Sequence, residues 1–499
     1  MAQKREADYG HTETDKLLNE VENRISSTFM QAEMEMQKKL ADWYADFEKE
    51  DKEKAERVSK GKLTQEEYIK WRQEQMRKGR RMEVLADRLT QDFSNADKKA
   101  MEIVNGSTAD VFALNANYAA YTIEDLTGQD IAWTLYDRNT VDRLMRDNPD
   151  LLPQPKVDIP KDKLWNRQHI TNAITQGILQ GESIPNIANR LQEVIGMDKR
   201  AAVRSARTAT TGAECAGRVE SYKHAKGMGI ELQQEWLSTL DNRTRHAHRE
   251  LDGQKADVDE PFEIDGYKIK YPGDPSAPGY LVYNCRCTLI ASLPGMSAGK
   301  RRAKDPISGK YEIIDGGITY KEWEAKKKAQ NPEAWGTYMK KGKNLSTDTK
   351  QYKEYKDVLG KEMPKTLDEF QNLKYNNPEK WDKLQTTKHQ TDVVNNAPCE
   401  TTVKKFAEYF LNPEQKHAQE FFDVGYTTED VLLLRYDVAK QFDLEKATDI
   451  TYDADGKKRF KIYMSLGVTE KKRFRTAWID DDENSKPRIV TAFREDTKK

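Results

Sequence analysis

The stretch that most constrains the fold is residues 236–287, in which two histidines and two cysteines flank a segment rich in proline and glycine. His246 and His248 lie in its first part, and Cys285 and Cys287 close it. Residues 271–279 contain three prolines and two glycines, which exclude a regular helix or a central strand because proline lacks an amide donor. Another interaction must therefore hold the two ends of the stretch together.

The residue types at the two ends suit a tetrahedral Zn²⁺ ion. Thiolate sulfur and imidazole nitrogen are common zinc ligands, and a structural ion supplies the energy that closes such a loop. The pairs are His-x-His and Cys-x-Cys, and on a strand the side chains of residues i and i+2 share a face. The expected ligands are His246, His248, Cys285 and Cys287, with Asp241 in place of His246 as an alternative.

Other interpretations of the same cluster stay open. The cysteines are small enough to be buried as apolar residues in a metal-free hairpin. A metal hydrolase would use Glu250 or Asp252 to transfer protons, and a thiol nucleophile would pair Cys285 with His248. The structural site is preferred because no helix start or glycine context activates the thiol.

Length and composition indicate several domains. The chain has 499 residues, and about two to four domains are expected at this length. Hydrophobic residues make up 36% and charged residues 33%, which favours long exposed helices over one deep core. The net charge of -1 excludes a uniformly basic coat for nucleic acid but not local patches. The sparse cysteines and the lack of a long apolar run predict a protein made in the cytoplasm, without a disulfide scaffold or a membrane partner.

The expected fold class is multidomain and mainly α-helical in the N-terminal half. Residues 1–150 are a helical arm for partner contact, since apolar residues recur at three- and four-residue spacing, with a break near Gly61. Four prolines between positions 149 and 160 mark a boundary. Residues 160–295 form an α+β domain with a small β region. Its helices are expected to break at Gly181 and Gly196, with Ser183 and Asp198 as caps.

Residues 296–400 are expected to be a charged linker with short helices. Its basic residues, at 300–304 and at Lys340, Lys341 and Lys343, make packaged DNA a further candidate partner. Residues 401–499 form an α+β domain, helices followed by an antiparallel sheet. Its expected strands are 459–466, 473–479 and 488–493, in which apolar and polar residues alternate.

The order and separation of short motifs within residues 162–294 resemble the phage minor head (head morphogenesis) family, the Mu F-like proteins. The positions that match this family's motif are Asp241, Arg243, His248, Gly253, Cys285 and Cys287. Many relatives carry a Cys-x-x-Cys pair near Arg245 and His248, whereas this chain has His246 and His248 there. This departure leaves the ligand set open.

The resemblance implies a bacteriophage structural protein of the virion head. It implies a minor capsid protein present in few copies, located with the portal protein inside the procapsid and in contact with capsid and scaffold proteins. Head assembly would require it.

Residues 401–495 resemble the small ribonuclease domains of the barnase, EndoU, colicin and RelE group, which are fused to some phage head proteins. The resemblance implies metal-independent RNA cleavage, with an RNA substrate. His417 would be the acid or base and Arg475 would bind phosphate, beside Thr476 and Thr491. An ADP-ribosyltransferase fits less well, because no convincing Arg, Ser-Thr and Glu-x-Glu set stands out. The further alternatives are an inert surface, an RNA-cleaving effector packaged in the virion, and a host nucleic-acid-binding protein.

Overall fold

The computed structural model describes the chain apart from residues 1–7, 65, 69, 72–79, 130–131, 149–158, 180–183, 295–298, 307, 455, 482–484 and 496–499. It contains two compact units, Met1–Trp335 and Gly336–Lys499. The expected break at Gly181 with its cap at Ser183, and three of the four prolines expected to mark a boundary, lie outside the described residues. Pro160, the fourth proline, lies in the first turn of α5. The described elements confirm a multidomain fold, helical first and ending in helices followed by an antiparallel sheet.

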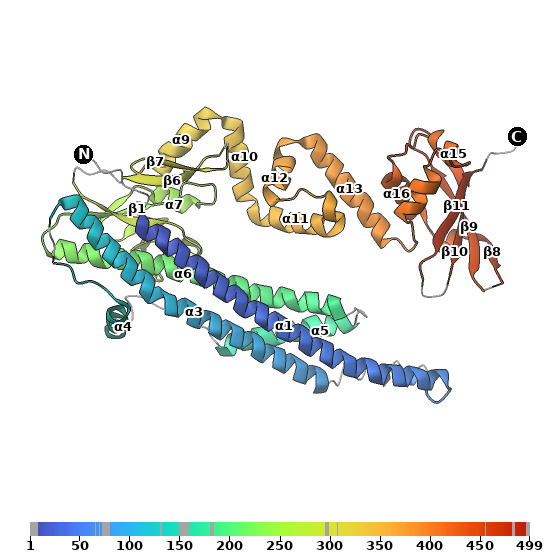
Figure 1. Cartoon of the computed structure of the whole chain (residues 1–499), viewed down its shortest axis with the longest axis horizontal. Coiled ribbons are helices and arrows are strands. Elements are labelled where there is room, and N and C mark those ends of the chain that lie inside the picture. The colour runs from blue at the N-terminus through green and yellow to red at the C-terminus, as the bar shows by residue number, and fades with distance from the viewer. Residues whose placement is uncertain are drawn as a thin grey trace. The chain divides into compact units, whose positions relative to one another are not determined.

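Long helices form most of the first unit (Figure 1). α1 (Tyr9–Ser59), α3 (Arg80–Thr127) and α6 (Ile184–Gly227) pack against one another, with α5 (Ile159–Leu179) against α3 and α6 and the short α4 (Arg138–Asp147) against α3. The apolar positions at three- and four-residue spacing are the ones buried between them. They include Val21, Ile25 and Phe29 from α1, Leu89 and Phe93 from α3, and Ile170, Leu191 and Ala206.

The expected break at Gly196 is wrong, because α6 runs without interruption through this residue. Glycine in a helix interior costs about 1 kcal/mol relative to alanine, but it removes no backbone hydrogen bond. Ile195 before it and Ala202 after it are both buried in the same core. Continuous burial along this face outweighs the cost, and Asp198 lies inside the helix instead of capping it.

A small sheet follows α6. β1 (Gln233–Leu237) lies between β2 (Lys255–Asp257) and β5 (Thr288–Ser292), and both pairs are antiparallel. α7 (His246–Leu251) connects β1 to β2. The hairpin of β3 (Phe262–Ile264) and β4 (Tyr267–Ile269) and the single turn α8 (Gly279–Val282) lie between β2 and β5.

The proline- and glycine-rich segment packs directly on α6. A Cβ atom at Gly212 of α6 would lie 2.8 Å from the carbonyl oxygen of Gly273. Gly273 has φ +81°, a backbone conformation that glycine adopts without steric cost. Two glycines therefore allow the loop and the helix backbone to touch.

The expected linker begins with ordered structure. β6 (Lys300–Lys304) and β7 (Tyr311–Asp315) form a hairpin, and α9 (Tyr320–Gln330) and α10 (Pro332–Lys343) follow. The interpretation of residues 300–304 as a solvated or DNA-binding run is wrong for Arg301. This side chain is buried and forms an ion pair with Asp252, its Nη2 atom 2.9 Å from the carboxylate. Charge alone does not distinguish a paired arginine from a solvated one.

Three helices form a small core in the second unit. α11 (Leu345–Leu359) is followed by a 3₁₀ turn, η1 (Gly360–Glu362), and by α12 (Leu367–Asn376) and α13 (Pro378–Asn396). Phe370 is fully buried, and the rings of Tyr352, Tyr355 and Trp381 pack around it.

The C-terminal part begins with short helical segments. These are α14 (Val403–Lys405), the π-helical η2 (Phe406–Phe410), α15 (Ala418–Phe422), α16 (Val431–Gln441) and the 3₁₀ turn η3 (Leu444–Lys446). A four-stranded antiparallel sheet of order β11-β10-β9-β8 follows.

The three expected strands are confirmed as β9 (Lys458–Leu466), β10 (Lys472–Asp480) and β11 (Arg488–Arg494). β8 (Thr448–Tyr452) was not expected, because its residues are all exposed and lack a buried alternation. In β9 the apolar residues from Phe460 to Leu466 are buried at alternate positions, and their polar neighbours face away.

Candidate metal centre

Three of the four expected ligands, His248, Cys285 and Cys287, lie together and are buried, with one ligand atom of each within 4.8 Å of the others. The Nδ1 atom of His248 is 3.2 Å from Sγ of Cys287 and 3.5 Å from Sγ of Cys285. Around a tetrahedral zinc ion, with bonds of about 2.3 Å to sulfur and 2.0 Å to nitrogen, these atoms are separated by about 3.5 Å. The residues therefore fit a metal of this size.

The contact of the other ring nitrogen of His248 determines which tautomer this histidine adopts. Nε2 lies 2.7 Å from the carbonyl oxygen of Leu281 in α8, which can only accept a hydrogen bond. We therefore assign the proton to Nε2, which leaves the lone pair of Nδ1 directed at the two sulfur atoms. Trp236 of β1 packs edge-on against the imidazole at a centroid distance of 5.4 Å and excludes water from this side.

The two thiols differ in their ease of ionisation. Burial raises the pKa of Cys285, and its hydrogen bond to Cys287 adds to the effect. Burial also opposes ionisation of Cys287, but the hydrogen bond from Cys285 lowers the pKa of this thiol below its usual value. The Ser238 hydroxyl lies 3.5 Å from Sγ of Cys287 and donates its own proton to the backbone carbonyl oxygen of His248. The thiolate is the form that binds a metal ion.

The other two candidate ligands lie apart from this group. The prediction that His246 and His248 share the face of a strand is wrong, because both belong to helix α7, where residues i and i+2 point in different directions. His246 is exposed. Asp241 is buried, but its carboxylate accepts hydrogen bonds from the Arg286 guanidinium, 2.5 and 2.8 Å away. Within the described residues, the group contains three ligands.

The part of the chain that contains this group is similar to a known protein family. Residues 168–290 match the family described as Phage Mu protein F like protein. We call residues 168–290 the Mu F-like domain after this similarity. It contains α7, α8, the three-stranded sheet except for the last residues of β5, and all the candidate ligands.

Similarity to individual proteins extends beyond the Mu F-like domain. Minor head protein GP7 of Bacillus phage SPP1 is 29% identical over 316 residues, which cover 62% of this chain and 97% of GP7. NAD(+)--arginine ADP-ribosyltransferase EFV of Enterococcus faecalis is 36% identical over 164 residues, 33% of this chain and 32% of that protein. The uncharacterised protein YqbB of Bacillus subtilis is 29% identical over 131 residues, 26% of this chain and 42% of YqbB. No solved structure matches.

The two acidic residues considered for catalysis in the Mu F-like domain differ in their exposure to solvent. Glu250 is exposed on α7. Asp252 is buried, and its oxygen atoms accept hydrogen bonds from the backbone amides of Ser238 and Tyr320 and from Arg301. These bonds tie β1, α9 and β6 together, so Asp252 is a structural residue.

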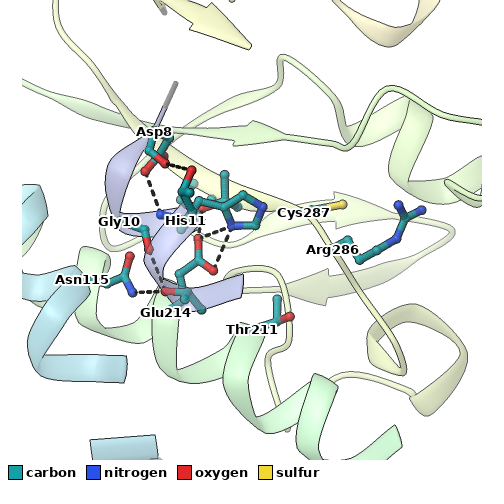
Figure 2. A network of polar contacts seen from close by, with 12 residues as sticks. Asp8, Gly10, His11, Asn115, Thr211, Glu214, Arg286 and Cys287 are labelled. Carbon is teal, nitrogen blue, oxygen red and sulfur yellow. Dashed lines mark hydrogen bonds and ion pairs between the residues drawn. The ribbon is translucent and has the colours of Figure 1, made fainter. Parts of the chain in front are cut away.

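A polar network that sequence reasoning missed joins the start of α1 to the Mu F-like domain (Figure 2). The Nδ1 atom of His11 lies 2.9 Å from the buried carboxylate of Glu214 in α6, which also accepts a hydrogen bond from Thr288 of β5. Arg218, one turn after Glu214, donates hydrogen bonds of 2.6 and 2.8 Å to Asp8. Because the partners are about 200 positions apart, their spacing carries no signal in the sequence.

The C-terminal candidates for ribonuclease chemistry are partly brought together. His417 and Arg475 both pack against the ring of Phe493, at 5.7 Å between ring centroids and 4.1 Å from guanidinium carbon to centroid. Thr476 is fully buried, and its hydroxyl donates to the carbonyl oxygen of Ile462. Thr491 of β11 is half-buried opposite Ala477.

Among the described helices, none has an apolar stretch long enough to cross a membrane.

Proposed function

We propose that this protein is a minor head protein of a bacteriophage, located in the virion head with the portal protein and in contact with capsid and scaffold proteins. The observation that supports the proposal most strongly is the similarity to minor head protein GP7, which covers 97% of GP7. The Mu F-like domain supports it as well. The long helices α1 and α3 provide extended surface for contacts within a head.

Co-sedimentation tests the proposal. The full chain is co-expressed with the capsid, scaffold and portal proteins of the same phage, and the assembled procapsids are separated on a gradient. We expect the chain to migrate with procapsids and to be reduced in procapsids assembled without the portal protein. A chain that stays at the top of the gradient in both assemblies contradicts the proposal.

We further propose that His248, Cys285 and Cys287 hold a structural Zn²⁺ ion in the Mu F-like domain. The separations of the Nδ1 and Sγ atoms and the hydrogen bond at Nε2 support this assignment. The ion would connect α7 to the segment before β5 and so close the loop that contains the prolines. Its role would be structural, because Glu250 is exposed and Asp252 is already paired with Arg301.

Cobalt substitution tests the ligand set. Purified chain reconstituted with Co²⁺ should show the thiolate charge-transfer and tetrahedral ligand-field absorption bands that report sulfur ligands. Cys285→Ser should weaken both bands, and Cys399→Ser, which alters a buried cysteine of the second unit, should retain them. Identical spectra of the two variants would show that Cys285 is not a ligand.

A second function, ribonuclease activity of the C-terminal sheet, is favoured by one observation. His417 and Arg475 meet at Phe493, and Glu420 lies 2.7 Å from Nδ1 of His417, where it orients the imidazole. A histidine held by a carboxylate beside an arginine supplies a proton-transfer group and a phosphate-binding group.

The activity test uses the full chain with total RNA as substrate. We expect cleavage by the wild type and its loss in His417→Ala and in Arg475→Ala. Arg473→Ala is the matched control, since Arg473 precedes Arg475 by two residues on β10 and packs on Tyr463 instead. No cleavage by the wild type, or equal cleavage by all four proteins, rejects the proposed function.

A further inference from the structure

A cavity of about 360 Å³ lies in the helical part of the first unit, between α3, α5 and α6. Three aspartates and one asparagine are among its lining residues, Asp97, Asp162, Asn166 and Asp198. No lysine or arginine lines it within the described part of the chain. The cavity is therefore rich in oxygen atoms that accept hydrogen bonds and poor in groups that neutralise them.

Asn166 shows most directly that acceptors outnumber donors in this cavity. This residue is fully buried, and its Nδ2 atom donates to Asp97 at 3.3 Å, but its Oδ1 atom has no hydrogen-bond partner. Reversing the amide would place Oδ1 against the Asp97 carboxylate, where two acceptors repel, so the observed orientation is favoured. A buried acceptor without a partner costs about 1–3 kcal/mol.

Asp198 also carries a buried acceptor atom without a hydrogen-bond partner. Its Oδ2 atom is buried and also lacks a hydrogen-bond partner. Among the described residues, neither Asp97 nor Asp198 forms an ion pair with a basic side chain. Burial raises the pKa of Asp97 to about 7, and burial together with repulsion from Asp97 raises the pKa of Asp198 to about 8. The Asn166 amide offsets part of the charge of these two carboxylates, and within the described residues no basic side chain offsets the rest.

We propose that Asp97, Asp198 and the Oδ1 atom of Asn166 bind a hard divalent cation, Mg²⁺ or Ca²⁺, in this cavity. Both ions take oxygen ligands, and Mg²⁺ in particular is often held by one or two carboxylates with several retained waters. The cavity has room for such waters, each of which takes about 30 Å³. Asp162, a third carboxylate in the lining, adds negative charge near the ion.

The cation would connect three helices that are far apart in sequence. Asp97 belongs to α3, Asn166 to α5 and Asp198 to α6, so one ion would tie together the helices that pack around it. Its ligands are all oxygen, unlike the sulfur and nitrogen of the Cys/His group, so the two sites select different metals. The assignment therefore does not depend on the proposed zinc site or on the role in the phage head.

Terbium luminescence tests the site, because Tb³⁺ replaces Ca²⁺ and is excited by a nearby indole, here that of Trp165 in the cavity lining. The wild-type chain should give sensitised emission that Ca²⁺ or Mg²⁺ displaces, and the more effective competitor identifies the natural ion. Asp97→Asn and Asp198→Asn should weaken Tb³⁺ binding at least about tenfold. Glu102→Gln, which removes an exposed carboxylate from α3, should leave it unchanged.

Thermal unfolding at pH 8 gives a second readout that does not need Trp165. The melting temperature of the wild type should rise when Ca²⁺ or Mg²⁺ is added, and that of the double variant Asp97→Asn, Asp198→Asn should not. Emission that is equal in the wild type and the aspartate variants overturns the proposal. The proposal is also overturned if neither cation raises the melting temperature of the wild type while the double variant melts at a higher temperature than the wild type. In that case a proton shared by the two carboxyl groups, and not a cation, would occupy the space between them.

Discussion

The Nδ1 atom of His248 lies 3.2 Å from the Sγ atom of Cys287, across 39 positions of the sequence. The contact brings α7 to the segment just before β5, although residues 271–279 between them cannot form regular structure. Leu281 holds the opposite side of the same imidazole at 2.7 Å. A side chain fixed on both sides is prepared for a ligand at Nδ1, since it loses little freedom when the ligand binds.

The crossing of α3 and α6 should be sensitive to a single methyl group. A Cβ atom at Gly217 of α6 would lie 2.4 Å from the carbonyl oxygen of Phe112 in α3, a distance that requires the two helices to move apart. We expect Gly217→Ala to destabilise the chain by about 1–3 kcal/mol in urea unfolding. Gly227→Ala in the same helix meets no atom within 4 Å and is the control. Equal midpoints for both variants would show that α3 and α6 do not approach this closely.

The contact between His11 and Glu214 should make stability depend on pH. Burial alone would lower the pKa of His11, but the Glu214 carboxylate raises it from 6.5 to about 9. A raised folded-state pKa means that the contribution is fully present below pH 6.5 and is lost as pH rises through 9. His11 is 30% exposed, so we expect the loss to be on the order of 1–2 kcal/mol.

Chemical unfolding of the wild type and of His11→Gln at a series of pH values measures this contribution. Because Asp97 and Asp198 titrate in the same range, the quantity compared is the difference between the two proteins at each pH. This difference should shrink from pH 6 to pH 10. A difference that stays constant would mean that the imidazole is not charged in the folded state.

Residues 345–396 should unfold cooperatively as a small helical core. Asp348 is fully buried and accepts hydrogen bonds from Gln371, Lys374 and Tyr375, which connect α11 to α12. Asp348→Ala leaves Lys374 without this partner, and we expect a loss of about 3 kcal/mol in the unfolding transition of the second unit. Asp382→Ala, on the exposed face of α13, should change it little. Indistinguishable transitions would indicate a loosely ordered linker.

Much of the secondary structure follows from local patterns. The alternation of apolar and polar residues predicted both ends of β9, β10 and β11 to within about one residue. The spacing of Val21 and Ile25 predicted α1, and the glycine at position 61 predicted its end. β8 was missed because its side chains are all exposed, and the break at Gly196 was wrong because packing, not local preference, determines the continuity of α6.

The candidate sites were predictable to the extent that their residues are close in sequence. His248, Cys285 and Cys287 stood out because residue types that bind metals gather in one stretch. His246 was grouped with them on the assumption of a strand, and the helix α7 separates the two imidazoles. The Asp97, Asn166 and Asp198 cavity had no such signal, since its residues come from three helices and each resembles an ordinary polar position.

The metal content of the purified full-length chain tests the central claim most directly. Elemental analysis after gel filtration should find about one zinc ion per chain in the wild type and in Cys399→Ser, and almost none in His248→Ala and Cys285→Ser. Ca²⁺ or Mg²⁺ at the aspartate site does not affect this count, because only zinc is compared. A wild type that carries no more zinc than Cys285→Ser contradicts the assignment of these residues as a metal centre.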